Sequence, residues 1–299
     1  MCVSTISSTP SCPGSPAELN PIICSNQKLL YDALYHAASG TLDEFCADPK
    51  YLGAKIGYLC LLHTWGSEMN FHPISMPSCW AEGLMRRTTG KGKGTVFLPI
   101  HVVSRKFRGK YMAELKRLWQ DGRLVFGGTS EKYRNHYTFH ELMDACYKKE
   151  WIPHCKETFN GAQSVIAYLG KYTHRIAVSN HRILCMDEKT VTFSVKDYKN
   201  GGGWKTLTVS GVEFVRRFLM HVPPKRFVRI RHYGILASRN KKKLITLCRN
   251  LPGGRACLSQ LKDKTGPEII KQLWGVDICK CRHCGGRIVS HHKVIPLRN

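Results

Sequence analysis

The spacing of hydrophobic residues predicts helices in the first half of the chain. From Asn20 onward, LLYDALYHAASGTLDEFC repeats apolar residues at intervals of three and four, the period of one helical face. The same pattern predicts helices over 52–65, around 110–119 and over 136–151, the last with Thr138 as its N-cap. The β-branched segment 95–103 is predicted as a strand, whereas residues 71–93 show no regular pattern.

Alternating apolar and polar residues predict strands in the second half. HRILCMD, KTVTFSVKDY and KTLTVS are separated by the turn sequences MDEK and KNGGG. An amphipathic helix is predicted over 212–222, and another helix over 162–175. Helices mixed with mostly antiparallel strands indicate an α+β fold.

The charge of the chain points to a polyanionic partner. Lys and Arg number 46 against 21 Asp and Glu, which gives a formal charge of +25. Nucleic acid is the first candidate partner, and a basic protein that needs charge only for solubility is the alternative. There is no apolar run long enough for a membrane span, and the start of the chain lacks the features of a signal peptide. We therefore expect a cytoplasmic protein whose 14 cysteines are thiols or metal ligands.

A basic segment near residue 230 is a candidate DNA-binding element. PPKRFVRIRHYG alternates arginine with apolar residues, so one face of a strand would show Arg and Lys and the other Phe, Val and Ile. Arg226, Arg229 and Arg231 are the candidates for phosphate contacts. The alternative is an ordinary solvated charged face.

Two tyrosines lie four residues apart in the predicted helix 162–175. Tyr168 and Tyr172 would share a face of that helix, with Lys171 and Arg175 beside them. A tyrosine oxygen can attack a DNA phosphodiester and store the bond energy in a phosphotyrosine link. On spacing alone, however, such a pair more often serves packing.

Several long strings of the chain resemble one family. They are PAELNPIICSNQKLLYDALYHAASGTL, LGAKIGYLCLLHTWG, FLPIHVVSRKFRGKYMAELK, AYLGKYTHRIAVSNHRI, VTFSVKDYK and EFVRRFLMHVPPKRFVRIRHYGILASRN. Together they cover most of 16–71 and 95–250, and they resemble the two-tyrosine transposases of rolling-circle insertion sequences, members of the HUH endonuclease superfamily.

That resemblance implies a fold and a chemistry. It implies an antiparallel sheet of the HUH type packed with helices, followed by a mostly β and helical C-terminal part. It also implies that Tyr168 and Tyr172 are the nucleophiles, that Mg or Mn is the cofactor, and that single-stranded DNA at element ends is the partner. The oligomeric state stays open.

The metal-binding motif of that family is disrupted here. Two histidines flanking a hydrophobic residue should follow Trp65, but the chain reads FHPISMPSCW from Phe71, and only His72 and Pro73 match. Reading the codons of 74–81 one base early permits His-Ile-His, so we interpret 72–94 as frameshifted. The alternative is that the sequence has diverged and that the metal is held by other ligands. These would be His63, His72 or His101, with Gln163 as the third ligand near the tyrosine helix.

The resemblance divides the chain into four parts. Residues 1–18 read as a disordered or out-of-frame start that lacks the family's N-terminal zinc module. Residues 19–185 are the catalytic region, 186–250 a basic DNA-binding part, and 251–299 a tail. The alternatives to an active transposase are a catalytically dead DNA-binding remnant and a product that does not fold.

The tail contains half of a zinc knuckle. Cys281 and Cys284 form a C-x-x-C pair followed by two glycines. Because zinc takes four ligands, the pair needs partners such as Cys257 or a nearby histidine. The alternative is that this pair is half of a former zinc site whose other ligands were lost with the N-terminal module.

Overall fold

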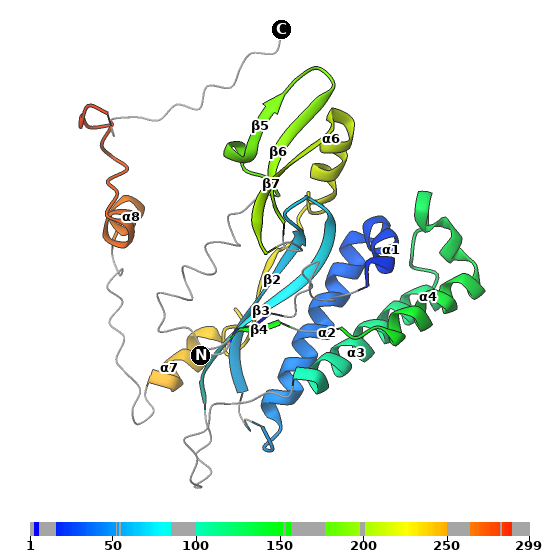
Figure 1. Ribbon diagram of the computed structural model, residues 1–299. Helices are drawn as coiled ribbons and strands as arrows, with labels where there is room; N and C mark the ends of the chain where they lie inside the picture. Colours follow the sequence, from blue (N-terminus) through cyan, green and yellow to red (C-terminus); the bar gives the residue numbers. More distant parts are fainter. Residues whose placement is uncertain are drawn as a thin grey trace. The chain divides into compact units, whose positions relative to one another are not determined.

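The structure is a computed structural model that describes residues 3–5, 16–51, 53, 55–84, 100–151, 154–156, 177–197, 201–249, 264–281 and 283–288. The chain divides into two compact units, residues 1–248 and 249–299. Its described strands pair antiparallel and are mixed with helices, which confirms the α+β class (Figure 1).

The elements of the first unit follow one another in this order: β1 (Val3–Thr5), η1 (Ala17–Leu19), α1 (Asn20–Ser25), α2 (Gln27–Ala47), β2 (Lys55–Trp65), β3 (Phe71–Leu84), α3 (Ile100–Gln120), η2 (Gly128–Arg134), α4 (His136–Lys148), β4 (His154–Lys156), η3 (Asn180–Arg182), β5 (Ile183–Met186), β6 (Thr190–Asp197), β7 (Gly203–Ser210), α6 (Gly211–Met220), β8 (Ile230–Gly234) and α7 (Lys241–Arg249), the last reaching the unit boundary. The second unit contains α8 (Gly266–Trp274).

The central strand of the larger sheet is β2, which pairs antiparallel with β3 on one side and β8 on the other. The helix predicted over 52–65 is therefore wrong. Side chains on both faces of β2 are buried, for example Tyr58 and Leu61. A strand buried on both faces reads as a continuous apolar run without alternation, which periodicity cannot distinguish from a helix.

Two further predictions for this region are corrected. The supposedly patternless stretch 71–93 forms strand β3 as far as Leu84. Backbone pairing with β2 holds this strand, so no hydrophobic alternation is needed to define it. In the predicted strand 95–103, residues 100–103 are the first turn of α3. Val103, Phe107 and Tyr111 are all buried, and their spacing of four places them on one helical face that overrides the local β propensity.

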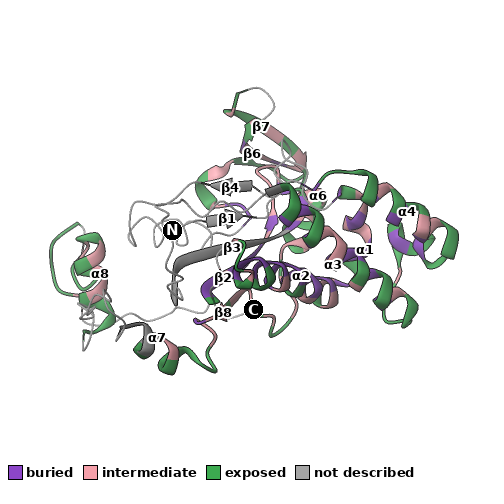
Figure 2. Ribbon diagram, turned by 90° about the horizontal axis from the view of Figure 1, so that it is seen from below, coloured by how far each residue is buried: buried purple, intermediate pink, exposed green. Residues whose placement is uncertain are grey.

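Helix α2 packs against both the sheet and α3 (Figure 1). The helix predicted from Asn20 is confirmed and runs as two pieces, α1 and α2, separated at Asn26. The main hydrophobic core joins α1, α2, α3, α4 and β2, and Figure 2 shows these buried positions along α2 and its neighbours.

The start of α4 differs from the prediction in its capping residue. Asn135 is the N-cap, since its side-chain oxygen accepts a 2.8 Å hydrogen bond from the Tyr137 amide. Thr138 lies inside the first turn, and its hydroxyl donates to the backbone of Lys132 and Asn135. The Thr138 side chain therefore stabilises the turn that precedes α4 and does not cap the helix.

A smaller sheet, β5-β6-β7, has its own core with α6. These three strands and the amphipathic helix were predicted and are confirmed. Phe193 at the centre of β6 is fully buried, and its ring lies 5.5 Å from that of Phe214 on α6. The division expected between residues 185 and 186 falls inside β5, which pairs with β6.

Within the start of the chain, for which no regular structure was expected, Val3–Thr5 pairs with β4 and Ala17–Leu19 forms a 3-10 helix. The second unit, by itself, contains α8 and a short turn after it. In this turn the backbone of Lys280 forms an isolated antiparallel β-bridge with the backbone of Arg287.

Candidate functional site

The tyrosine segment lies outside the described residues. Tyr168, Lys171, Tyr172 and Arg175 all fall between 157 and 176. The helix predicted there and the roles assigned to these residues stay predictions.

The resemblance places two metal-binding histidines at positions 74 and 76 of β3, and the pairing register of this strand shows which residues lie opposite those positions. Position 74 lies opposite His63 and position 76 opposite Leu61. This chain has isoleucine at 74 and methionine at 76, neither of which is a ligand for a hard divalent cation. His72 lies two residues before position 74, at the start of the same strand.

His72 and His63 are half-buried neighbours at this end of the sheet. Burial lowers the pKa of His72 to about 4. It likewise lowers the pKa of His63 to about 4, with smaller contributions from Arg229, His221 and His72. Both imidazoles are therefore neutral at pH 7. His101 is elsewhere: it is exposed on α3 and lines a cavity of about 380 Å³ with Arg105 and Arg108.

A third histidine of this region, His221, was not anticipated from the pattern of residues. His221, the C-cap residue that follows α6, contacts the Thr64 hydroxyl through Nδ1 at 3.3 Å and the Met69 carbonyl oxygen through Nε2 at 3.0 Å. Its ring also stacks on Phe71. With both ring nitrogens in hydrogen bonds, His221 joins α6 to the β2–β3 hairpin.

The described residues do not fit the divalent ion that the resemblance implies. None of them forms a group of three or more His, Cys, Asp or Glu side chains placed to hold a metal. Of the histidines of the motif, only His72 is present, and β3 has Ile74 and Met76 at the positions where ligands would be needed. No chemical step can be assigned to a metal in this part of the chain.

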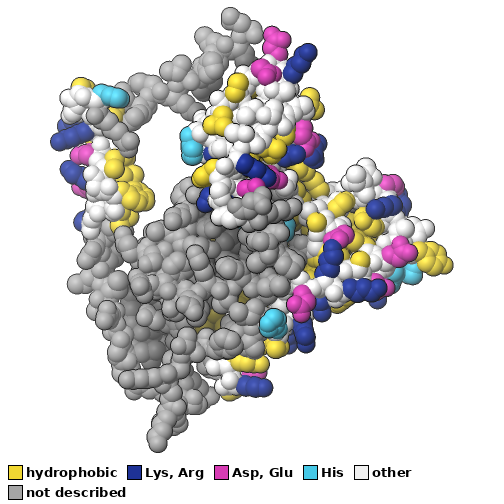
Figure 3. Space-filling model, in the orientation of Figure 1, with side chains coloured by type: hydrophobic (Ala, Val, Ile, Leu, Met, Phe, Trp, Pro, Cys, Tyr) yellow, Lys and Arg dark blue, Asp and Glu magenta, His cyan; other side chains and the backbone are white. Residues whose placement is uncertain are grey.

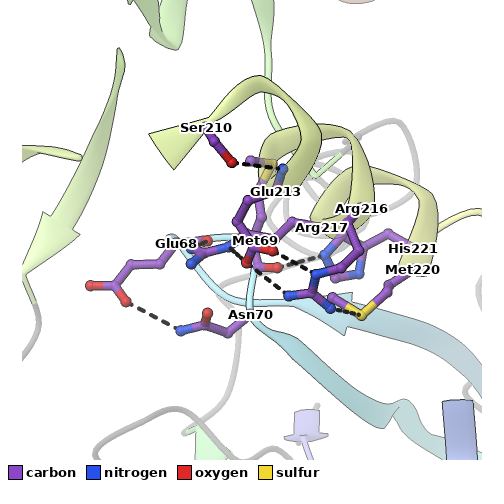
Figure 4. A network of polar contacts seen from close by, with 9 residues as sticks. All are labelled: Glu68, Met69, Asn70, Ser210, Glu213, Arg216, Arg217, Met220 and His221. Atoms are coloured by element: carbon purple, nitrogen blue, oxygen red, sulfur yellow. Dashed lines mark hydrogen bonds and ion pairs between the residues drawn. The ribbon is translucent and has the colours of Figure 1, made fainter. Parts of the chain in front are cut away.

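A polar network fixes the tip of the β2–β3 hairpin to α6 (Figure 4). Arg217 of α6 donates to the Glu68 carbonyl at 3.0 Å and to the Glu213 carboxylate at 2.7 Å. Arg216 and then Arg217 lower the pKa of Glu213 to about 2. Met69, at the tip, is fully buried with a φ of +56°.

The three candidate DNA-binding arginines have different surroundings. Arg226 is exposed, with a φ of +62°. The Arg229 guanidinium lies 5.4 Å from the centre of the Trp65 ring. Arg231 forms an ion pair with Asp32 and lies 4.2 Å from the centre of the Tyr35 ring. Arg226 is therefore the one of the three whose charge points to solvent without an ion pair or ring contact among the described residues.

Arg226 and Arg231 border a cavity of about 430 Å³ between α2 and β8. Lys28 and His232 also line it, and Asp32 is its acidic member. On the face shown in Figure 3, basic side chains are distributed over several described elements and mixed with acidic ones. The lining of the cavity thus carries the basic side chains of Lys28, Arg226 and Arg231 against the single acidic side chain of Asp32, which pairs with Arg231.

The turn after α8 carries the two cysteines of the predicted knuckle. The Cys281 amide donates to the Gly286 carbonyl at 2.8 Å, and the Gly285 amide donates to the Cys281 carbonyl at 3.0 Å. Gly285 has a φ of +70°, which closes this turn. Backbone amides of Cys284 and His283 lower the pKa of the Cys281 thiol. The turn is thus arranged to favour a thiolate.

A family model with the description "Putative transposase" (Y2_Tnp) matches residues 57–243, from β2 to α7. The chain belongs to this family of transposases. No helix within the described residues has both the length and the apolar character needed to cross a membrane.

Two curated proteins are similar to the chain. The "Putative transposase y4qJ" of Sinorhizobium fredii (strain NBRC 101917 / NGR234) is 37% identical over 242 residues, 80% of this chain and 60% of that protein. The transposase for insertion sequence element IS801 of Pseudomonas savastanoi pv. phaseolicola is 25% identical over 294 residues, 94% of this chain and 68% of that protein. The chain thus spans about 60% of the length of the first relative. No solved structure matches the chain significantly.

Proposed function

We propose that the chain is a transposase that cuts and rejoins single-stranded DNA at element ends through a tyrosine–DNA link. The observation that carries this proposal is the family match over 57–243, which spans both Tyr168 and Tyr172. The net charge of +25 supports a DNA partner.

In the proposed reaction, the oxygen of Tyr168 or Tyr172 attacks the scissile phosphorus. A tyrosine–phosphate bond to the 5′ side forms as the bond to the 3′ oxygen breaks, and the proton lost by tyrosine is balanced by the one that the 3′ hydroxyl gains. Lys171 and Arg175 neutralise the phosphate. A 3′ hydroxyl reverses the link in the joining step, with the second tyrosine available for the other strand.

The DNA backbone has a suitable place beside the cavity between α2 and β8. Lys28 and Arg226 are exposed there and can pair with phosphates. Arg229 and Arg231 instead pack on the rings of Trp65 and Tyr35.

The first prediction concerns the covalent link. The full chain, incubated with manganese and single-stranded oligonucleotides from the element ends, should give a protein–DNA adduct that survives denaturing electrophoresis. Tyr168→Phe combined with Tyr172→Phe should abolish the adduct, because the attacking oxygens are gone. Tyr137→Phe is the matched control, since Tyr137 is 78% exposed and outside the motif. An adduct that persists in the double variant would refute the assignment of the nucleophiles.

A second candidate function is DNA binding without strand cleavage. It is favoured by Ile74 and Met76, which stand on β3 at the positions where the resemblance places metal ligands. Under this alternative the unmutated chain retards the oligonucleotide in native gels but forms no adduct. A chain that neither retards DNA nor forms an adduct would refute both candidates.

We also propose that Cys281 and Cys284 bind zinc, with the remaining ligands supplied by residues such as Cys257, which lies outside the described residues, or a nearby histidine. Their turn favours a thiolate, and zinc prefers such ligands. We expect zinc in the purified full chain, and its loss in the variant Cys281→Ser with Cys284→Ser, measured by elemental analysis. Cys24→Ser with Cys185→Ser is the matched control, because both cysteines are exposed and lie outside this turn. Equal zinc content in the two variants would contradict the site.

A further inference from the structure

The small sheet has two faces of opposite character. On one face, Phe193, Val195 and Leu207 pack in the core beneath α6. Side chains alternate along a strand, so the intervening positions of β6 and β7 point away from that core. The register pairs these outer positions as Thr192 with Thr208, Ser194 with Thr206, and Lys196 with Trp204. We call these six residues the Trp204 face.

Trp204 is 63% exposed on this otherwise polar surface. The ammonium group of Lys196 lies over its ring, 5.5 Å from the centre. A large aromatic side chain gains little stability from such a position, because most of its apolar area stays in water. An exposed indole flanked by a cation is instead suited to binding a ligand that has both an aromatic ring and a negative charge.

Apart from Trp204 and Lys196, the Trp204 face carries only the small hydroxyl side chains of Thr192, Ser194, Thr206 and Thr208. The hydroxyls of Thr192 and Thr208 lie 2.8 Å apart, and Thr206 is exposed. Small hydroxyls leave room for a chain to lie along the sheet, and they can donate hydrogen bonds to phosphate oxygens.

The nearby acidic side chains are paired. Asp197 and Glu68 both form ion pairs with Lys205. The Lys196 ammonium group lies over the Trp204 ring and forms no ion pair among the described residues, so its positive charge stays on the outer face.

We propose that the Trp204 face is a binding site for single-stranded DNA, on which a base stacks against the Trp204 indole while Lys196 and the hydroxyls contact the neighbouring phosphates. Single strands fit this chemistry better than duplexes because the faces of paired bases are already stacked on one another. The inference rests on the proposed function, to which it adds a site for the strand outside the tyrosine segment.

The test compares three tryptophan variants of the full chain. Binding of a fluorescent oligothymidylate and of a blunt duplex of equal length is measured by anisotropy at one salt concentration. Trp204→Ala should weaken single-strand binding about tenfold, the typical loss of one stacked base, and leave duplex binding unchanged. Trp204→Phe should restore most of the single-strand affinity. Trp274→Ala, which removes a similarly exposed tryptophan in α8 (67%), should have no effect.

The outcomes separate this inference from the proposed function. If the unmutated chain binds the oligonucleotide and Trp204→Ala binds it equally well, the inference fails and the proposed function stands. Equal losses for single strand and duplex also overturn it, since stacking would not be the cause. If the unmutated chain binds neither DNA, the proposed function fails and the inference with it. Melting curves of Trp204→Ala confirm that the variant is folded.

Discussion

Gly234→Ala should destabilise the chain by about 4 kcal/mol, near the upper end of what single substitutions do. Gly234 ends β8 with a φ of +59°, directly opposite Gly57 of β2. A Cβ at this position would lie 1.8 Å from the carbonyl oxygen of Ile56, and that contact is with backbone. The same carbonyl accepts a hydrogen bond from the Ile235 amide, so relieving the overlap would separate β8 from the central strand. Denaturant unfolding of the full chain measures the loss.

The variant Gly201→Ala shows how much of the loss of stability comes from backbone strain alone, without a steric overlap. Gly201 also has a positive φ, +82°, but nothing lies within 4 Å of the place that a Cβ would occupy there. This variant should lose only about 1 kcal/mol, the typical cost of the left-handed conformation for a residue other than glycine. Equal losses at Gly201 and Gly234 would show that close packing of β8 on β2 contributes little to stability.

Local sequence patterns were informative where one face of an element is exposed. The strands β5, β6 and β7 and helix α6 alternate in the expected way because one side of each meets the core and the other meets water. The same reasoning failed for β2. Its residues Tyr58 to Leu62 are nearly all buried by partners far away in the sequence, including β8, and no local period can reveal such partners.

The candidate site was predicted only in part. The family could be read from residue identities, as could the basic character of the segment near residue 230. The contacts of His221 and Arg217 with the β2–β3 hairpin could not, because each joins residues about 150 positions apart. Trp204 did leave a signal, as an aromatic residue at a polar position of an alternating strand, but its significance depends on the packing of the opposite face.

The core beneath the Trp204 face should be as sensitive as β8. Phe193→Ala removes a fully buried ring that contacts Phe214 and belongs to the same cluster as Met69 at the hairpin tip. Losing such a ring costs about 3–5 kcal/mol, through lost burial and the cavity left behind. Because this cluster is separate from the main core, amides of β6 and β7 should lose more protection against hydrogen exchange than those of α2.

Thr192→Ala is the matched control for Phe193→Ala, since it changes the adjacent residue on the outer face of the same strand. We expect it to lower the free energy of unfolding by less than about 1 kcal/mol, because only a solvent-accessible hydroxyl pair is lost. Equal acceleration of exchange in α2 and β6 of Phe193→Ala would show that the two cores unfold together. Faster exchange confined to the small sheet would mean that this sheet unfolds separately from the main core. The packing of Phe193 against α6 would then be what keeps the strands that carry Trp204 folded.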